Sequence, residues 1–267
     1  MELTIPEAIL LLAIDDETGK PLVDDSTLGI SFAAGAVAQL VMDGRIRLAD
    51  ERDASTGAKP RTFVEGDGVA QGAGPYGAGD WAAGGIGSGD SDARLEPLVE
   101  HCIGRSPKEA LSKVVGLGGA GTPAGKARSQ TLEGFAEAGL LARQDQRFLG
   151  ITWSHRWLRG ERTAVEDGLQ HRAKQILQGE ARAASARQRE PAAPSDEVLV
   201  PALAILHTVR ALTKVFPELP KEQVVAAGKA LAADDWLSDS VRESLTALEG
   251  AMTAIMVATV IVPTVTS

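Results

Sequence analysis

Arginine and lysine side chains are interleaved with large apolar ones between residues 124 and 160. This mixture suits a membrane interface, because apolar side chains enter the acyl boundary while arginines pair with lipid phosphates. Each basic residue near an anionic surface contributes about 1 kcal/mol. We expect headgroup-binding cations and membrane-inserting side chains here. The cations are Arg128, Lys126, Arg143 and Arg147, and the inserting side chains are Phe148, Leu149, Ile151 and Trp153.

The formal charge of the chain is unevenly distributed. The 267 residues carry a net charge of −9, yet residues 105–190 hold 15 basic and 9 acidic side chains. A positive segment inside an acidic protein indicates a face for an anionic partner. The negative total argues against bulk binding of nucleic acid, so we expect no nucleic-acid partner.

Two other interpretations of the same segment stay open. If Phe148, Ile151 and Trp153 pack inward, the chain is a soluble protein-interaction scaffold that has lost lipid specificity. A helix followed by two short strands is also the outline of a winged-helix wing, and basic wings contact DNA phosphates. The third interpretation is therefore a winged-helix-like DNA-binding protein.

Motifs for catalysis or for a resident cofactor are weak. Residues 116–121 match G-x-G-x-x-G, but a capped helix rather than a strand is expected before them, and no βαβ pattern surrounds them. The four histidines show no metal-ligand spacing. The single cysteine, Cys102, is expected to be a small buried hydrophobe. We expect no enzyme activity, no cofactor and no metal.

Helix signals frame the segment that carries this chemistry. Thr4 and Glu7 have capping-box spacing, with Pro6 in the first turn, and predict a short apolar helix that ends near Ile14. A second capping box opens with Ser106. Further helices are expected where apolar residues recur with helical spacing. They cover about 27–42, 124–138, 163–178, 195–216, 221–233 and 238–260.

Few strands are expected between these helices. Residues 45–48 alternate like a short strand, and two apolar runs around the polar residues 144–146 read as a β-hairpin with its turn there. Residues 65–91 are glycine-rich and predict a flexible insertion. The predicted fold class is mainly α: a single compact helical domain over 1–267, with a protruding β-hairpin and a few short strands.

Several stretches carry a family likeness when taken in order. They are the leucine run and turn at 10–20, the helix and strand at 36–48, the Ser-Gly-Asp at 88–90, the hairpin residues 138–141 and 148–149, and the helix at 198–216. In this order and spacing, the sequence resembles the Golgi phosphoprotein 3 family in a bacterial form. The likeness covers most of the chain except the glycine-rich insertion.

This resemblance implies a mostly helical domain that docks on membranes. Eukaryotic members bind phosphatidylinositol 4-phosphate, insert a hydrophobic hairpin and recruit cargo enzymes through cytosolic tails. Their headgroup pocket uses a Trp and an Arg around the second helix and two Arg one turn apart before the hairpin. Here those positions hold Asp24, Ala33, Gly125 and Arg128. Because only Arg128 carries over, with Lys126 beside it, the resemblance implies a generic contact with anionic lipid.

The expected partner is therefore an anionic phospholipid surface. The N-terminus has no basic region of the secretory type, and the longest apolar stretch, 251–263, is too short to span a bilayer. We expect a cytoplasmic protein that associates peripherally with the inner face of the membrane. A protein cargo and a homo-oligomer are left open.

Overall fold

A short apolar helix forms the centre of the molecule. The computed structural model describes residues 3–66, 88–116, 121–148, 151–179, 196–232 and 246–255. Within them, every residue of α1 (Ile5–Ala13) is buried. Glu7 Oε2 accepts the backbone N–H of Thr4 at 2.9 Å, as the capping box predicts. Because α1 is apolar on all sides, other helices must cover it all round.

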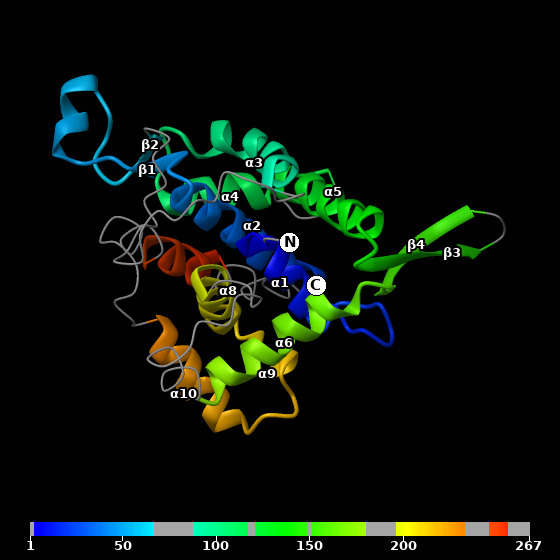
Figure 1. The fold of residues 1–267 in the computed structure, drawn as a ribbon. Coiled ribbons are helices and arrows are strands. Elements are labelled where there is room, and N and C mark those ends of the chain that lie inside the picture. The colour runs from blue at the N-terminus through cyan, green and yellow to red at the C-terminus, as the bar shows by residue number, and fades with distance from the viewer. Residues whose placement is uncertain are drawn as a thin grey trace, which may run out of the picture.

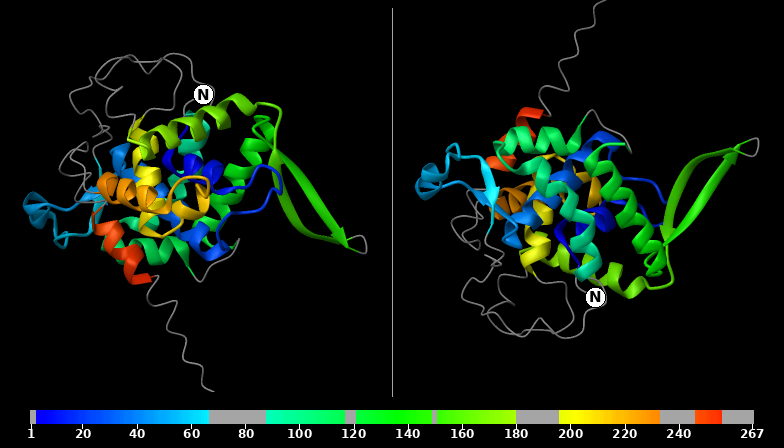
Figure 2. Two further views of the ribbon diagram at one scale, coloured as in Figure 1. Left: turned by 90° about the horizontal axis from the view of Figure 1, so that it is seen from below. Right: turned by 90° about the horizontal axis from the view of Figure 1, so that it is seen from above.

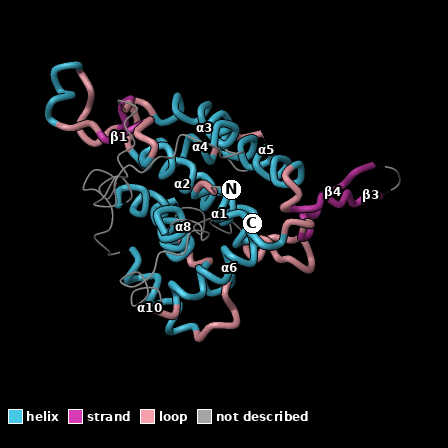
Figure 3. Tube along the Cα trace, viewed as in Figure 1, coloured by secondary structure: helices cyan, strands magenta, loops and turns pink. Residues whose placement is uncertain are grey.

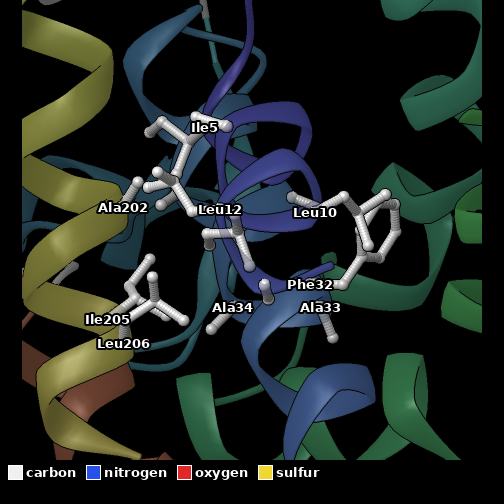
Figure 4. Packing of buried hydrophobic residues seen from close by; sticks show 14 of the residues in the cluster. Ile5, Leu10, Leu12, Phe32, Ala33, Ala34, Ala202, Ile205 and Leu206 are labelled. Carbon is white, nitrogen blue, oxygen red and sulfur yellow. The ribbon is translucent and has the colours of Figure 1, made fainter. Parts of the chain in front are cut away.

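The second helix, α2 (Asp25–Met42), packs closely along α1. A Cβ atom on Gly35 would lie 2.8 Å from Ile9 Cδ1, so this close approach requires glycine. Figure 4 shows Leu10 of α1 beside Phe32 of α2, with Ile5 and Leu12 on the side of α8 (Asp196–Thr208). Among the described helices, α2 is long and apolar enough to cross a membrane, but 83% of that stretch is buried inside the protein.

The other helices surround this pair in two groups. On one side of α1 and α2 lie α3 (Ser88–Cys102), α4 (Pro107–Val115) and α5 (Pro123–Glu137) (Figure 1). On the other side lie α6 (Thr163–Leu177), α8, α9 (Leu212–Val215) and α10 (Lys221–Ala232). Residues 246–255 are also helical, and Leu248, Ala251 and Met252 join the core.

Strands are confined to two small antiparallel pairs (Figure 3). β1 (Ile46–Leu48) pairs with β2 (Phe63–Glu65), and the 3₁₀ helix η1 (Glu51–Thr56) lies between them in the chain. β3 (Leu141–Phe148) pairs with β4 (Ile151–Arg159). The two pairs project from opposite ends of the helical body (Figure 2). The predicted mainly α class with a protruding hairpin is confirmed.

Two sequence predictions need correction here. The helix expected over 195–216 breaks after Thr208, because Arg210 adopts a left-handed backbone with φ of 59° and α9 starts at Leu212. The glycine-rich insertion is shorter than 65–91, since Glu65 closes β2 and residues 88–91 begin α3. Its remainder, 67–87, lies outside the described residues, as does the C-terminal part of the helix expected over 238–260.

Candidate functional site

The base of the β3–β4 hairpin is anchored in the helical body. α5 ends at Glu137, and Gly139 turns the chain with φ of 72°. Leu140 and Leu141 follow and are buried. On the other strand, the backbone N–H of Trp157 donates to Gly19 O at 3.1 Å, which ties β4 to the loop between α1 and α2. The hairpin therefore leaves the body from a fixed base.

The turn of the hairpin lies farther along the chain than the sequence predicts. Residues 144–146, the expected turn, are the middle of β3 and pair with 154–156. The last pair is Phe148 with Ile151, so the chain reverses after Phe148 and not at residues 144–146. A register irregularity lies between Gln146 and Arg147. Phe148 and Ile151, two of the residues expected to insert, are thus the last pair toward the tip of the hairpin.

The predicted inserting residues can be located by their backbones. Phe148 ends β3, while Ile151 and Trp153 belong to β4. Their side chains, and that of Arg147, are not among those that the structure describes, and Leu149 lies wholly outside the described residues. Their insertion therefore stays a prediction, and the structural finding is that the backbones of Phe148, Ile151 and Trp153 lie toward the far end of a projecting ribbon (Figure 1).

Arg143 lies in a polar cluster on the exposed stem of the hairpin. Its Nε contacts Asp145 Oδ1 at 2.9 Å, and its Nη1 lies 3.9 Å from Glu133 Oε1 on α5. His155 Nδ1 also lies 2.8 Å from Asp145 Oδ1. The hydrogen bond with His155, followed by that with Arg143, holds the pKa of Asp145 below its ordinary value. Arg143 is solvent-exposed but already shares a carboxylate.

Arg128 is held in a different place by a different carboxylate. Its Nη2 lies 2.8 Å from Asp25 Oδ1 at the start of α2, and only 15% of the side chain is exposed. Asp24 caps the same helix, with Oδ1 accepting the Thr27 N–H at 2.8 Å. Hydrogen bonds from the Thr27 hydroxyl and from the Thr27 N–H both lower the pKa of Asp24. Arg128 and Arg143 are therefore held by different carboxylates, and no sequence signal predicts the Asp25–Arg128 pair.

Lys126 is exposed on α5, the helix that leads into the hairpin. The other exposed residues of this helix are Gln130, Glu133 and Glu137. A recognition helix for DNA presents basic and polar side chains to the major groove. The exposed face of α5 has one lysine and two glutamates, so it does not favour the winged-helix interpretation.

Cys102 has the environment of a core residue. It is fully buried, and burial raises the pKa of its thiol to about 12. A thiol in this environment is not a reactive nucleophile at neutral pH. In the part of the chain that the structure describes, no group of three or more side chains of the metal-ligating types converges.

A comparison with known protein families shows which family this chain belongs to. The family model described as Golgi phosphoprotein 3 (GPP34) matches residues 5–248. The chain belongs to the Golgi phosphoprotein 3 family. The match runs from the first residue of α1 to the helix at 246–255 and includes the hairpin. None of the curated proteins matches the chain. The Golgi phosphoprotein 3 family is not a known enzyme family.

The residues at the family's pocket positions can now be placed in this Golgi phosphoprotein 3 member. Asp24 is the N-cap of α2, and Ala33 is fully buried within α2. Gly125 is buried in the first turn of α5, one turn before Arg128. The start of α2 and the N-terminal half of α5 therefore lie together, joined by the Asp25–Arg128 ion pair.

Proposed function

We propose that this Golgi phosphoprotein 3 family member is a peripheral membrane protein that docks on anionic phospholipid through the β3–β4 hairpin. One observation carries the proposal: a ribbon anchored at its base projects from the helical body, and its last described pair is formed by two apolar residues, Phe148 and Ile151. Elsewhere, among side chains that the structure describes, Val225 is the exposed large apolar residue. The proposed location is the cytoplasmic face of the membrane.

The dimensions and charge of the hairpin suit this role. At about 3.4 Å per residue, the eight residues of β3 extend about 27 Å, which is enough to present the tip beyond the helices. Complete burial of one Leu, Ile or Phe side chain contributes about 1.5–3 kcal/mol. The hairpin also carries four arginines against one aspartate, in a chain with a net charge of −9. Attraction to phosphate would orient the tip toward the membrane.

Specific recognition of a phosphoinositide is not favoured by the same structure. The N-terminus of a helix attracts anions because its first N–H groups have no partner within the helix. At the start of α2, Asp24 already accepts the Thr27 N–H, and Asp25 already pairs with Arg128. The protein's own carboxylates thus occupy the groups that would receive a phosphate, so the proposed ligand is anionic lipid in general.

A soluble interaction scaffold is the second candidate function. The observation that favours it is that Arg128 and Arg143 both have carboxylate partners within the protein. An arginine that is already paired gains less from a lipid phosphate, since it must exchange one anion for another. Vesicle binding separates the two candidates, because a scaffold would not bind a protein-free bilayer.

Vesicle composition should control binding. The full chain should co-sediment with phosphatidylcholine vesicles that contain phosphatidylserine, and not with phosphatidylcholine alone. Binding should weaken in 1 M salt, because the Debye length falls from about 8 Å to about 3 Å. Co-sedimentation assays at increasing salt measure both effects. Equal binding to neutral vesicles would contradict the electrostatic part of the proposal.

A pair of variants controls for the position of the charge. Replacing Arg143 and Arg147 with Gln should weaken binding by about 2 kcal/mol, or about 30-fold, at about 1 kcal/mol per basic residue. Arg52 is fully exposed on the opposite projection, where it pairs with Asp50. Arg52→Gln should leave vesicle binding nearly unchanged. An equal loss per arginine removed in the two variants would show that overall charge, and not the hairpin, governs binding.

The position of the phosphate should matter little. Vesicles that contain phosphatidylinositol 4-phosphate should bind less than tenfold better than phosphatidylserine vesicles of the same surface charge, because Asp24 and Ala33 replace the family's pocket residues. A titration by surface plasmon resonance measures the ratio. A preference above tenfold, about 1.4 kcal/mol, would require a headgroup pocket elsewhere in the chain.

A further inference from the structure

A buried carboxyl group without a hydrogen-bond partner lies beneath the base of the hairpin. Glu166, in the first turn of α6, is 2% exposed. Neither of its carboxyl oxygens has a hydrogen-bond partner among the described groups, and the same holds for Asp16 Oδ1. An unpaired buried carboxylate costs several kcal/mol, so such a group either takes up a proton or finds a cation. The vesicle-binding proposal uses none of these residues.

One cation is close, but it does not neutralise Glu166. Arg159, at the end of β4, has its Nε 3.8 Å from Glu166 Oε2 and its Nη1 3.9 Å from Asp16 Oδ2. Both distances exceed those of hydrogen bonds. The other guanidinium nitrogen, Nη2, bonds to Asp167, which is mostly exposed. The buried carboxyl group of Glu166 and the partly buried one of Asp16 therefore face one arginine, which already bonds to a third carboxylate.

The surroundings of Glu166 favour its neutral form. Burial is the largest effect that raises the pKa of Glu166, followed by the neighbouring carboxyl group of Asp16, and together they raise it to about 8. Arg159 acts in the opposite direction, and Asp167 adds to the increase. α1 packs against α6 and carries only apolar side chains after Glu7.

The remaining charged contacts of α6 lie farther along the helix. Arg172 pairs with Asp196 on α8, and Lys174 pairs with Glu218 before α10. These residues are about two turns from Glu166. They therefore join α6 to other helices rather than neutralising Glu166.

We propose that Asp16 and Glu166 share one proton, and that this proton fastens the α1–α2 loop and α6 to the base of the hairpin. The three elements meet there (Figures 1 and 2). Asp16 lies in the loop whose Gly19 carbonyl accepts the N–H of Trp157 in β4, and Gln170 Nε2 lies 3.3 Å from Asp16 Oδ2. When the proton leaves, the buried carboxylate of Glu166 and the partly buried one of Asp16 repel each other, and the hairpin base loosens.

The direction in which stability changes with pH follows from the raised pKa of Glu166. The folded pKa of Glu166, about 8, is above its ordinary value of 4.5. Between these two pH values the folded protein holds a proton that the unfolded chain has released, so stability falls as the pH rises. One such proton changes the unfolding equilibrium constant by up to about tenfold per pH unit.

Glu166→Gln tests the shared proton, because glutamine mimics the protonated acid and does not titrate. Between pH 6 and pH 8, the unfolding constant of the wild type should rise more than about tenfold relative to that of the variant in urea denaturation. Hydrogen exchange should be measured in peptides that cover residues 155–160, with the variant at the same pH as the reference for the intrinsic pH dependence of exchange. As the pH rises from 6 to 8, these peptides should lose protection in the wild type alone. Parallel pH profiles of the two proteins would overturn the proposal.

Two further variants keep the test decisive. Glu249 also has a pKa raised by burial, but it lies in the helix at 246–255, so Glu249→Gln should leave the pH dependence of peptides 155–160 unchanged. If Glu166→Gln does not fold, Asp16→Asn removes the partner charge and should reduce the pH slope. If stability depends on pH as proposed but hydrogen exchange of peptides 155–160 does not change with pH, the link to the hairpin is overturned. The test needs no lipid, so it is independent of membrane docking.

Discussion

Replacing Leu149 and Ile151 together with aspartate should abolish binding to anionic vesicles. The chain reverses between Phe148 and Ile151, so both new charges would lie beside the tip of the hairpin. Each charge would have to enter the acyl boundary in place of an apolar side chain, which is strongly unfavourable. The free energy of unfolding should change by no more than about 0.5 kcal/mol, because we expect the substituted residues to lie outside the core. Co-sedimentation and thermal melting measure the two effects.

The stem of the same strand provides the matched control. Ala142 and Gln144 are exposed residues of β3, well before the tip. Replacing both with aspartate adds the same charge to the hairpin, so this variant should weaken vesicle binding through charge alone and should retain part of it. If the tip variant melts at a much lower temperature than the stem variant, Leu149 and Ile151 are packed, and the scaffold function is favoured.

Phe32→Ala should give the largest loss of stability that we predict. Phe32 is fully buried in α2 and lies beside Leu10 of the central helix (Figure 4). Truncating a buried phenylalanine costs about 3–5 kcal/mol, since apolar surface is lost from the core and a cavity remains. Urea denaturation measures the change in unfolding free energy.

An exposed apolar residue is the comparison for this substitution. Val225 on α10 is 43% exposed, so Val225→Ala should change stability by no more than about 0.5 kcal/mol. If Phe32→Ala costs no more than Val225→Ala, the packing of α1 against α2 is not the core of the fold.

The start of α1, the start of α4 and the end of α2 could be predicted because local signals agree with the tertiary packing. Thr4 and Glu7 fix the start of α1, and Ser106 and Glu109 fix the start of α4 by the same hydrogen bonds. Gly44, with φ of 66°, follows the end of α2. In each case the residue that begins or ends the helix acts through its own backbone or side chain, so no distant contact is needed.

The turn of the hairpin could not be predicted in the same way. A strand with one buried face alternates between apolar and polar residues, and an interruption of that pattern marks its end. The stem of β3 has no buried face, because Ala142, Arg143, Gln144 and Asp145 are all exposed. Polar residues in the middle of a projecting ribbon therefore resemble a turn in the sequence.

Contacts between distant elements could not be predicted from the sequence either. Asp25 and Arg128 are separated by more than a hundred residues, and their ion pair exists only because α2 and α5 pack together. Asp16, Arg159 and Glu166 meet only because the α1–α2 loop, β4 and α6 converge. The sequence identifies these charged residues individually, but their partners depend on the fold.

Hydrogen–deuterium exchange of the full chain, with and without phosphatidylserine-containing vesicles, is the most direct test of membrane docking by the hairpin. It requires no substitution and reports each segment separately. We predict new protection in peptides that cover residues 146–154, with little change in peptides that cover β1, η1 and β2 on the opposite projection. Unchanged exchange at 146–154 under conditions where the protein sediments with the vesicles would contradict the proposal.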